Sequence, residues 1–388
     1  MTAKDVLTRH NESILKASLL FMLLATLAAT LWPFDPLHRN DVAWVGDGNG
    51  LRFGPYGMIL STAEFGNEAS HHSKSCSLEL WLEPGTTKDS SIILDFYHSP
   101  TLTNFSLRQE GDSLYLLRDV PEDRAHLRKA AIWVDHAFVA GKSTHLVINS
   151  GAEGTVVFIN GSQRAHVSNF GLTPYSLSGR LIFGDSTVHN DTWSGVLRGL
   201  GIYVRELSPS EISEPYSQWT SSRRQEDSAT VALYQFDERT GNTINNQVLG
   251  PDLFIPVHYN LVQHSFLTVP WREFYPTKGY VKDVVLNVVG FMPLGFLLFA
   301  YLSLIRKSDH PMLKTMILCA LISLAIETLQ AFLPTRTSGL TDVITNTTGG
   351  VLGAAFCEIK LVQAIFREIG FGGPAGKLEG QTPSCSHL

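Results

Sequence analysis

The chain has 388 residues, of which 44% are hydrophobic and 17% charged, and its formal net charge at pH 7 is −6. This composition excludes a disordered chain and a collagen-like one, and it provides no global basic field for binding nucleic acid. The length suggests two or three structural units. The mean hydropathy of +0.05 is typical of a soluble protein, but apolar residues are distributed very unevenly along the chain.

The cysteines are scattered and form no recognisable framework. They are Cys76, Cys319, Cys357 and Cys385. No pair has the C-x-x-C spacing of a zinc site, and only Cys76 lies in the long polar middle of the chain. This pattern argues against a disulfide framework and against a structural zinc site. We expect no resident cofactor and no metal ligands, with calcium in the polar middle left as an alternative that no motif supports.

The N-terminal region combines a basic tail with an apolar run. The tail carries Lys4, Arg9 and Lys16, and residues 17–32 contain no charge. The segment 13–34 is long enough to span a bilayer and reaches an interfacial tryptophan. A cleaved signal peptide is the alternative interpretation. The apolar run is longer than the usual apolar core of a signal peptide, which favours an uncleaved transmembrane helix.

Residues 38–275 have a different pattern, with short strands separated by turn residues rather than by helices. Segment 77–84 alternates with period two, and segment 155–159 runs into the turn Asn160-Gly161. Further strands are expected at 179–184 and 200–204. Regularly spaced strands of this kind predict an antiparallel β-sandwich.

The last third of the chain contains three more long apolar segments, 281–305, 311–333 and 341–366. Each is long enough to span a membrane as a helix, although Glu358 and Lys360 weaken the third. The tail 370–388 is rich in Gly, Pro and Ser and is expected to be disordered.

Basic residues in the short segments predict the orientation. With four spans, the N-terminal tail, the loop with Arg306 and Lys307, and the segment after the fourth helix all lie on one side. The positive-inside rule makes this side cytoplasmic, although Arg272, Lys278 and Lys282 on the other side weaken the bias. The β-sandwich therefore faces outward.

The predicted fold is mixed, with a bundle of four transmembrane helices and an all-β antiparallel sandwich as ectodomain. The predicted organisation is a cytoplasmic tail (1–12), transmembrane helix 1 (13–34), the sandwich (38–275), helices 2 (281–305), 3 (311–333) and 4 (341–366), and a disordered cytoplasmic tail (370–388).

The predicted spans carry polar residues near their outer ends. Pairs three or four residues apart share one side of a helix. These pairs are Asp283 with Asn287, Glu327 with Gln330, and Asp342 with Asn346, and Arg336 is the nearby cation. We expect these seven residues to form one intramembrane polar site.

Two interpretations of this polar site remain open. The polar groups could only hold helices together, since interhelical polar contacts are common. Three separate acidic residues exceed what packing requires, which favours a site for a lipid or an ion. Glu327 is the hardest to explain by packing alone. Gly349 and Gly353 form a G-x-x-x-G step that would allow close helix approach.

These residues resemble the VanZ-like membrane family. The similarity lies in Glu327-x-x-Gln330, Leu333-Pro334-x-Arg336 and Asp342-x-x-x-Asn346-x-x-Gly349, preceded by Asp283-x-x-x-Asn287 and Phe291-x-Pro293-x-Gly295. The resemblance covers the first helix and about residues 275–366. It implies a small bacterial membrane bundle of the cell envelope, in a family named after glycopeptide resistance. The long inserted domain departs from the minimal family pattern.

The middle of the chain resembles a laminin-G-like, or concanavalin A-like, jelly roll. The most specific piece runs from Trp193 to Ile212, and it resembles the closing strand and the short helix that follows. Relatives of this fold bind carbohydrate, often with calcium, but no calcium-binding motif is recognisable in this chain.

Several residues of the middle could bind ligands, but each has a simpler interpretation. Tyr97, Trp133 and Tyr175 could stack on sugars, although such rings are more often core or rim. Glu79 and Glu83 are too far apart along a strand for glycosidase chemistry, so we expect surface charges. His71, His72 and His98 are expected to be solvated loop residues rather than metal ligands.

The leading functional hypothesis is a non-catalytic protein of the bacterial cytoplasmic membrane, with both termini in the cytoplasm and the sandwich in the periplasm or exterior. Its sandwich would recognise glycan or a protein, and its polar site would hold a lipid or glycolipid group. One alternative is a membrane enzyme in which Glu327 is the general acid or base and Arg336 binds a lipid-linked phosphate. Another is a membrane-anchored adhesin. Membrane lipids are expected partners and nucleic acid is not.

Overall fold

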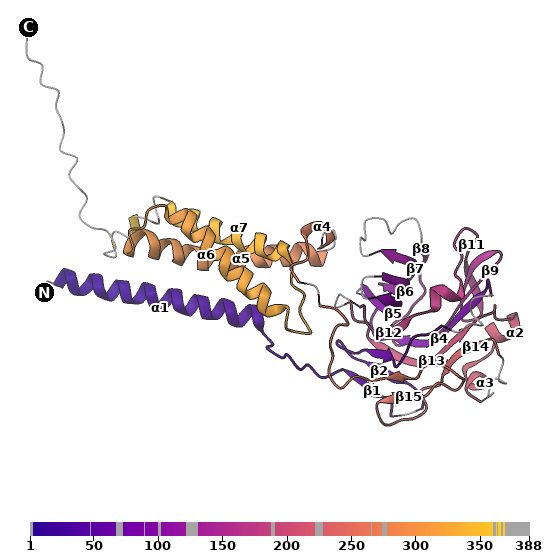
Figure 1. The fold of residues 1–388 in the computed structure, drawn as a ribbon. Coiled ribbons are helices and arrows are strands. Elements are labelled where there is room, and N and C mark those ends of the chain that lie inside the picture. Colours follow the sequence, from indigo (N-terminus) through magenta and orange to yellow (C-terminus); the bar gives the residue numbers. More distant parts are fainter. Residues whose placement is uncertain are drawn as a thin grey trace, which may run out of the picture. The chain divides into compact units, whose positions relative to one another are not determined.

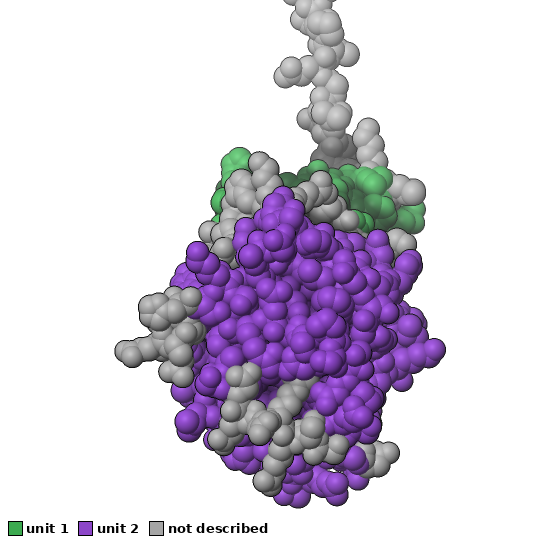
Figure 2. Space-filling model, turned by 90° about the vertical axis from the view of Figure 1, so that its right-hand side faces the viewer, with its two compact units in different colours: residues 1–34, 266–330, 338–388 green, residues 35–265, 331–337 purple. Residues whose placement is uncertain are grey.

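The computed structural model describes residues 3–359 except 47, 67–72, 89, 100–101, 122–130, 188–190, 222–227, 265 and 274–277, together with 362, 364, 365 and 368. The predicted disordered tail 370–388 lies outside these residues. The chain forms two compact units (Figure 2). The helical unit comprises residues 1–34, 266–330 and 338–388, and the sandwich unit comprises residues 35–265 and 331–337.

The helical unit contains long helices that follow the predicted apolar segments (Figure 1). They are α1 (Ala3–Leu31), α5 (Lys278–Ala300), α6 (Pro311–Gln330) and α7 (Leu340–Glu358). A short helix, α4 (Pro270–Glu273), precedes α5, and a π-helical turn, η4 (Tyr301–Ile305), follows it.

Among the described residues, three helical segments are long and apolar enough to cross a membrane, namely His10–Leu31, Tyr280–Ile305 and Pro311–Gln330. Helix α7 overlaps the predicted fourth span but is not one of the three. Asp342, Asn346 and several threonines make it less apolar than the others. The structure therefore supports several spans, and the predicted fourth span at α7 stays a prediction.

Apolar side chains divide between the inside and the outside of the helical unit. Phe291 and Leu294 of α5 are buried against Cys319 and Ile326 of α6, with leucines of α1 packed beside them. Exposed apolar side chains cover the outer faces of the same helices. They include Leu20, Phe21 and Leu24 of α1, Val285, Leu286 and Val289 of α5, and Leu321 of α6. Apolar residues on both sides are typical of helices in lipid.

The sandwich unit consists of two eight-stranded antiparallel sheets. The first sheet contains β1 (Val42–Trp44), β2 (Leu51–Phe53), β13 (Gly195–Tyr203), β4 (Cys76–Pro84), β9 (Thr144–Gly151), β10 (Gly154–Ile159) and β11 (Ser162–Val167) in that order, and β14 (Thr230–Tyr234) also pairs with β13. The predicted strands at 77–84, 155–159 and 200–204 lie in this sheet, whereas the one at 179–184 belongs to the second sheet.

The second sheet lies opposite the first (Figure 1). Its order is β15 (Thr243–Ile244), β16 (Leu253–Phe254), β3 (Ile59–Ser61), β12 (Arg180–Phe183), β5 (Ser90–Ser99), β6 (Leu102–Glu110), β7 (Ser113–Pro121) and β8 (Ala131–Val134). Short helical turns lie in the connections: η3 (Pro174–Leu177), α2 (Pro209–Ile212) and α3 (Tyr216–Ser221).

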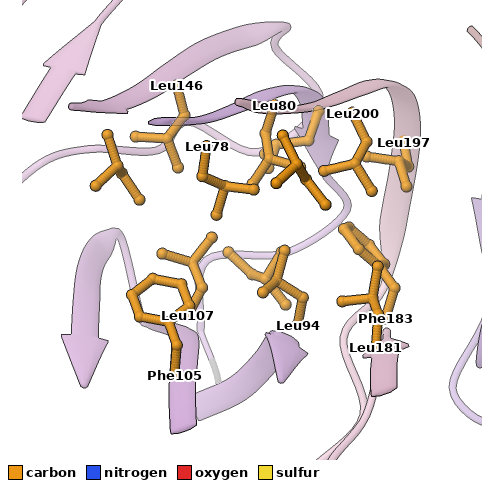
Figure 3. Packing of buried hydrophobic residues seen from close by; sticks show 14 of the residues in the cluster. Leu78, Leu80, Leu94, Phe105, Leu107, Leu146, Leu181, Phe183, Leu197 and Leu200 are labelled. Carbon is orange, nitrogen blue, oxygen red and sulfur yellow. The ribbon is translucent and has the colours of Figure 1, made fainter. Parts of the chain in front are cut away.

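The two sheets enclose one large apolar core (Figure 3). Alternate residues of each strand point inward, as the period of two requires. Leu78, Leu80 and Leu146 of the first sheet face Leu94 and Phe105 of the second in Figure 3. Because this core fixes the two sheets against each other, the loops and the residues on the outer faces of the sheets have fixed positions.

Candidate functional site

The polar residues of the predicted site fall on α5, α6 and α7, and specific hydrogen bonds join these helices. The amide nitrogen Nδ2 of Asn287 on α5 donates to Oδ1 of Asp342 on α7 at 2.8 Å. Nδ2 of Asn346, one turn further along α7, donates to Ser323 Oγ on α6 at 2.9 Å. The Asp342–Asn346 pair thus divides between two neighbouring helices.

Glu327 is almost completely buried, with 1% of its surface exposed. Its Oε2 accepts the backbone N–H of Gly339 at 2.9 Å, and Gly339 is the N-cap residue of α7. Glycine has no side chain that could cap the helix. A glutamate that reaches back to the N-cap N–H is the second half of a capping box, and a carboxylate is also favoured by the helix dipole. Here that glutamate comes from another helix.

The other three predicted residues have the following surroundings. Nε2 of Gln330 donates to the carbonyl oxygen of Thr30 on α1 at 2.8 Å, so it joins α6 to α1 rather than to α7. Asp283 is exposed on the first turns of α5. Arg336 is half-buried in the segment 331–337, which belongs to the sandwich unit. The polar cluster of the helices is therefore Asn287, Ser323, Glu327, Asp342 and Asn346.

Close contact between α5 and α7 places these polar groups. A Cβ atom added to Gly349 would lie 2.1 Å from the carbonyl oxygen of Val288, and one added to Gly353 would lie 1.9 Å from that of Met292. Gly295 of α5 likewise meets the backbone of Gly350. Small residues on both helices therefore bring the two backbones together.

The sandwich contains a buried charged cluster that the sequence analysis missed. Glu79 was expected to be a surface charge, but this is wrong, because its side chain is fully buried on the outer face of β4. Its Oε1 lies 2.9 Å from His145 Nε2, and its Oε2 accepts bonds from Tyr203 OH at 2.8 Å and Trp219 Nε1 at 3.0 Å. Helix α3 supplies Trp219 and covers this face.

Aromatic rings complete the Glu79 cluster. The ring of Trp81 stacks on that of His145 with centroids 3.9 Å apart and planes within 8°. Three hydrogen-bond partners satisfy the buried carboxylate, as a buried charge requires. Glu83 lies four residues further along β4 and is only half-buried. Its Oε1 lies 2.6 Å from Nε of Arg198, with which it forms an ion pair. The cluster therefore stabilises the sandwich from outside its core.

A second buried acid lies in the turn after β12. Asp185 accepts the backbone N–H of Ser186 at 2.8 Å and of Asp191 at 3.0 Å, and the hydroxyl of Tyr259 also donates to it. Burial raises the pKa of Asp185 to about 8 despite these bonds. The neighbouring carboxylate and burial also raise the pKa of Tyr259. Asp185 therefore holds a proton over part of the physiological pH range.

The three aromatic residues considered for sugar stacking have different surroundings. Tyr97 is buried in a small cluster with Met58 and Ile182. Trp133 is half exposed and packs edge-on against Tyr115. Tyr175 is 57% exposed and lines a hollow of about 450 Å³.

This hollow, which we call the Tyr175 hollow, combines the ring with polar groups. His98 is exposed at the end of β5, its ring lies 5.2 Å from that of Tyr175, and its Nε2 is 3.2 Å from Ser178 Oγ. Glu64 and Thr173 also line the hollow. An exposed ring beside hydroxyl and carboxylate groups suits a polar ligand with an apolar face. His71 and His72 lie outside the described residues.

Comparisons with known proteins identify both parts of the chain. A VanZ/LLP1 family model matches residues 218–362, and a model of the concanavalin A-like lectin/glucanases superfamily matches residues 61–213. The chain combines a VanZ-like domain with a concanavalin A-like domain. The VanZ-like match takes in α4 to α7 and the last strands of the sandwich, but not α1. With its apolar helices, the VanZ-like domain indicates a membrane protein.

Solved structures with low similarity also match the chain. A putative carbohydrate binding protein from Bacteroides ovatus is 10% identical with a TM-score of 0.37, and the match covers 56% of this chain and 58% of that one. A heptameric SAP-like pentraxin from Limulus polyphemus is 10% identical with a TM-score of 0.33, covering 57% and 94%. The chain thus spans less than two thirds of the Bacteroides protein. No curated protein matches the sequence.

Proposed function

We propose that this protein is a membrane protein of the cell envelope whose β-sandwich faces outward and recognises glycan. The observation that carries the proposal is a concanavalin A-like lectin domain joined at both ends to apolar helices of a membrane protein. The Tyr175 hollow is the proposed glycan site. Sugars present an apolar face that stacks on an aromatic ring and hydroxyls that bond polar groups, and Tyr175, His98 and Glu64 offer both.

The outward orientation follows from the predicted topology and can be tested on its own. In whole bacterial cells, a membrane-impermeant maleimide should label a Val139→Cys variant, because Val139 is exposed on the sandwich. The buried Cys76, Cys319 and Cys357 should react little. Cys385 is replaced by serine both in the Val139→Cys variant and in the parent chain that serves as its control. Labelling of Val139→Cys only after cell lysis would contradict the orientation.

Glycan recognition is tested with the full-length chain purified in detergent and applied to an array of bacterial envelope glycans. We expect binding that Tyr175→Ala abolishes and Trp133→Ala preserves, because both rings are exposed but only Tyr175 lines the hollow. Loss of binding in Trp133→Ala alone would place the site elsewhere. A wild-type chain that binds no glycan would favour the adhesin alternative with a protein partner.

For the helices, we propose that the polar cluster around Asp342 and Glu327 takes a lipid or glycolipid group near the outer leaflet. Asp342 and Asn287 are only half-buried, which supports access from one side, and Asp283 adds a further carboxylate on the exposed surface of α5. Carboxylates accept hydrogen bonds from sugar hydroxyls and amines. The alternative is an enzyme with Glu327 as general acid or base.

The two roles of the polar cluster predict different products. The purified chain is incubated with a lipid-linked cell-wall precursor, and the lipid is analysed by mass spectrometry. Retention of the unchanged precursor, lost in Glu327→Gln, supports binding alone. Conversion of the precursor that Glu327→Gln abolishes supports the enzyme. Equal behaviour of the wild type and Glu327→Gln would contradict both and leave the cluster as helix packing.

A further inference from the structure

A second hollow on the sandwich unit is lined by three segments that are far apart in sequence. It contains Leu37, His258, Asn260, His264, Phe332 and Pro334 and has a volume of about 580 Å³. Each segment is a connection to a candidate membrane span. Leu37 follows α1, residues 258–264 precede α4 and α5, and Phe332 follows α6. We call it the connection hollow.

Chain length limits how far the connection hollow can lie from the membrane. Phe332 is two residues beyond the end of α6 at Gln330, which allows at most about 7 Å. Leu37 is six residues beyond the end of α1 at Leu31, which allows at most about 21 Å. Both helices are candidate spans, so this hollow is tethered close to a bilayer surface at two points.

The lining of the connection hollow is amphipathic. Phe332 is 74% exposed and Leu37 67% exposed, so the apolar side of this hollow is open to a ligand. Prolines and an alanine extend this apolar side.

Polar groups form the other side of the hollow. Nδ1 of His258 donates to the carbonyl oxygen of Leu37 at 2.9 Å, which ties two of the connections together. Nε2 of His264 lies 2.7 Å from Oδ1 of Asn260, and the Asn260 amide keeps N–H donors beyond this bond. Burial lowers the pKa of His264, so its ring is neutral near pH 7. These groups favour hydrogen bonding over charge attraction.

We propose that the connection hollow binds one phospholipid of the outer leaflet. The side-chain amide of Asn260 donates to the phosphodiester headgroup, and the glycerol and upper acyl carbons lie against Phe332 and Leu37. This site is separate from the glycan site and from the polar cluster of the helices. It would fix the sandwich against the membrane surface that its connections approach.

The test is native mass spectrometry of the full-length chain in detergent, titrated with dioleoylphosphatidylcholine. We expect Asn260→Ala and Phe332→Ser to weaken retention of one phospholipid about three- to ten-fold, as expected for the loss of a hydrogen bond or an apolar contact. The matched controls are Asn242→Ala, at another exposed asparagine, and Leu249→Ser, at another exposed apolar residue of the sandwich. Both should retain the phospholipid as the wild type does.

Further titrations test which part of the lipid is recognised and distinguish this site from the other proposed sites. Dioleoylglycerol, which lacks the phosphate, should not occupy the Asn260-dependent site, and inorganic phosphate should not displace the phospholipid. Glu327→Gln should leave this site intact, whatever it does to lipid at the helices. Equal phospholipid retention in Asn260→Ala, Phe332→Ser and their controls would overturn the proposal without touching glycan recognition.

Discussion

Glu327 of α6 accepts a hydrogen bond from the backbone N–H of Gly339, the N-cap residue of α7, at 2.9 Å. The carboxylate thus supplies to α7 the cap that its own sequence lacks. This bond joins α6 to α7, and Glu327 lies one helical turn along α6 from Ser323, which bonds Asn346 of α7. A role in packing and a role in binding can be separated by changing its shape and its charge independently.

Glu327→Ala should destabilise the helical unit by roughly 1–3 kcal/mol, because it leaves a buried N–H without an acceptor. Glu327→Gln keeps an acceptor and should cost much less. Thermal unfolding of the purified chain in detergent, followed by helical circular dichroism, measures both. Equal destabilisation by the two variants would show that the charge, rather than the cap, holds α7.

Gly353→Ala should disrupt the packing of α7 on α5, because the added methyl group would lie 1.9 Å from the Met292 carbonyl oxygen. The expected cost is about 1–3 kcal/mol, as for overpacked interfaces. Gly290→Ala on α5 is the matched control, since nothing lies within 4 Å of its added Cβ. If both variants unfold in detergent at the same temperature, the α5–α7 contact is not tight.

Glu79→Ala should destabilise the sandwich by about 3–5 kcal/mol, because it leaves His145, Tyr203 and Trp219 without their shared acceptor. Glu83→Ala, on the same face of β4, removes a half-exposed ion pair with Arg198 and should cost about 0–1 kcal/mol. Unfolding followed by tryptophan fluorescence compares them. Similar losses in the two variants would contradict the role of the Glu79 cluster.

Asp185→Asn should reduce the pH dependence of sandwich stability. The pKa of Asp185 is raised from 3.8 to about 8, so between these values the folded state holds a proton that the unfolded state has lost. Stability therefore falls as pH rises through this window, and the asparagine variant should remove that fall.

The control for Asp185 has the opposite pKa shift. A hydrogen bond from His136 lowers the pKa of the exposed Asp112, so it stays ionised from pH 5 to pH 8. Asp112→Asn should leave the change in the melting temperature between these pH values as in the wild type. An unchanged pH dependence in Asp185→Asn would mean that Asp185 is ionised in the folded protein.

The sequence predicted the β-sandwich and the long helices because both depend on local periodicity. Alternation over 77–84 predicted a strand, and Leu78 and Leu80 of this strand lie in the core. It could not show that the opposite face, with Glu79, is covered by α3, because Trp219 lies 140 residues further along the chain. The available signal was Trp81, a large aromatic residue two positions from Glu79 and therefore on the same face of the strand.

The helical polar residues show the same limit. Helical spacing placed Asp342 and Asn346 on one side of α7, but it could not tell that Asp342 bonds α5 and Asn346 bonds α6. Nor could it show that Gln330 turns to α1 or that Arg336 groups with the sandwich unit. These assignments depend on which helices meet, and periodicity within one helix carries no such information.

The measurement that tests the central claim most directly is equilibrium binding of the full-length chain to the envelope glycan that it selects on the array. Tyr175→Ala should weaken this affinity by roughly ten-fold or more through the lost stacking surface. Trp133→Ala should leave it unchanged. Failure of the wild-type chain to bind any envelope glycan, or equal affinity in wild type and Tyr175→Ala, would contradict glycan recognition at the Tyr175 hollow.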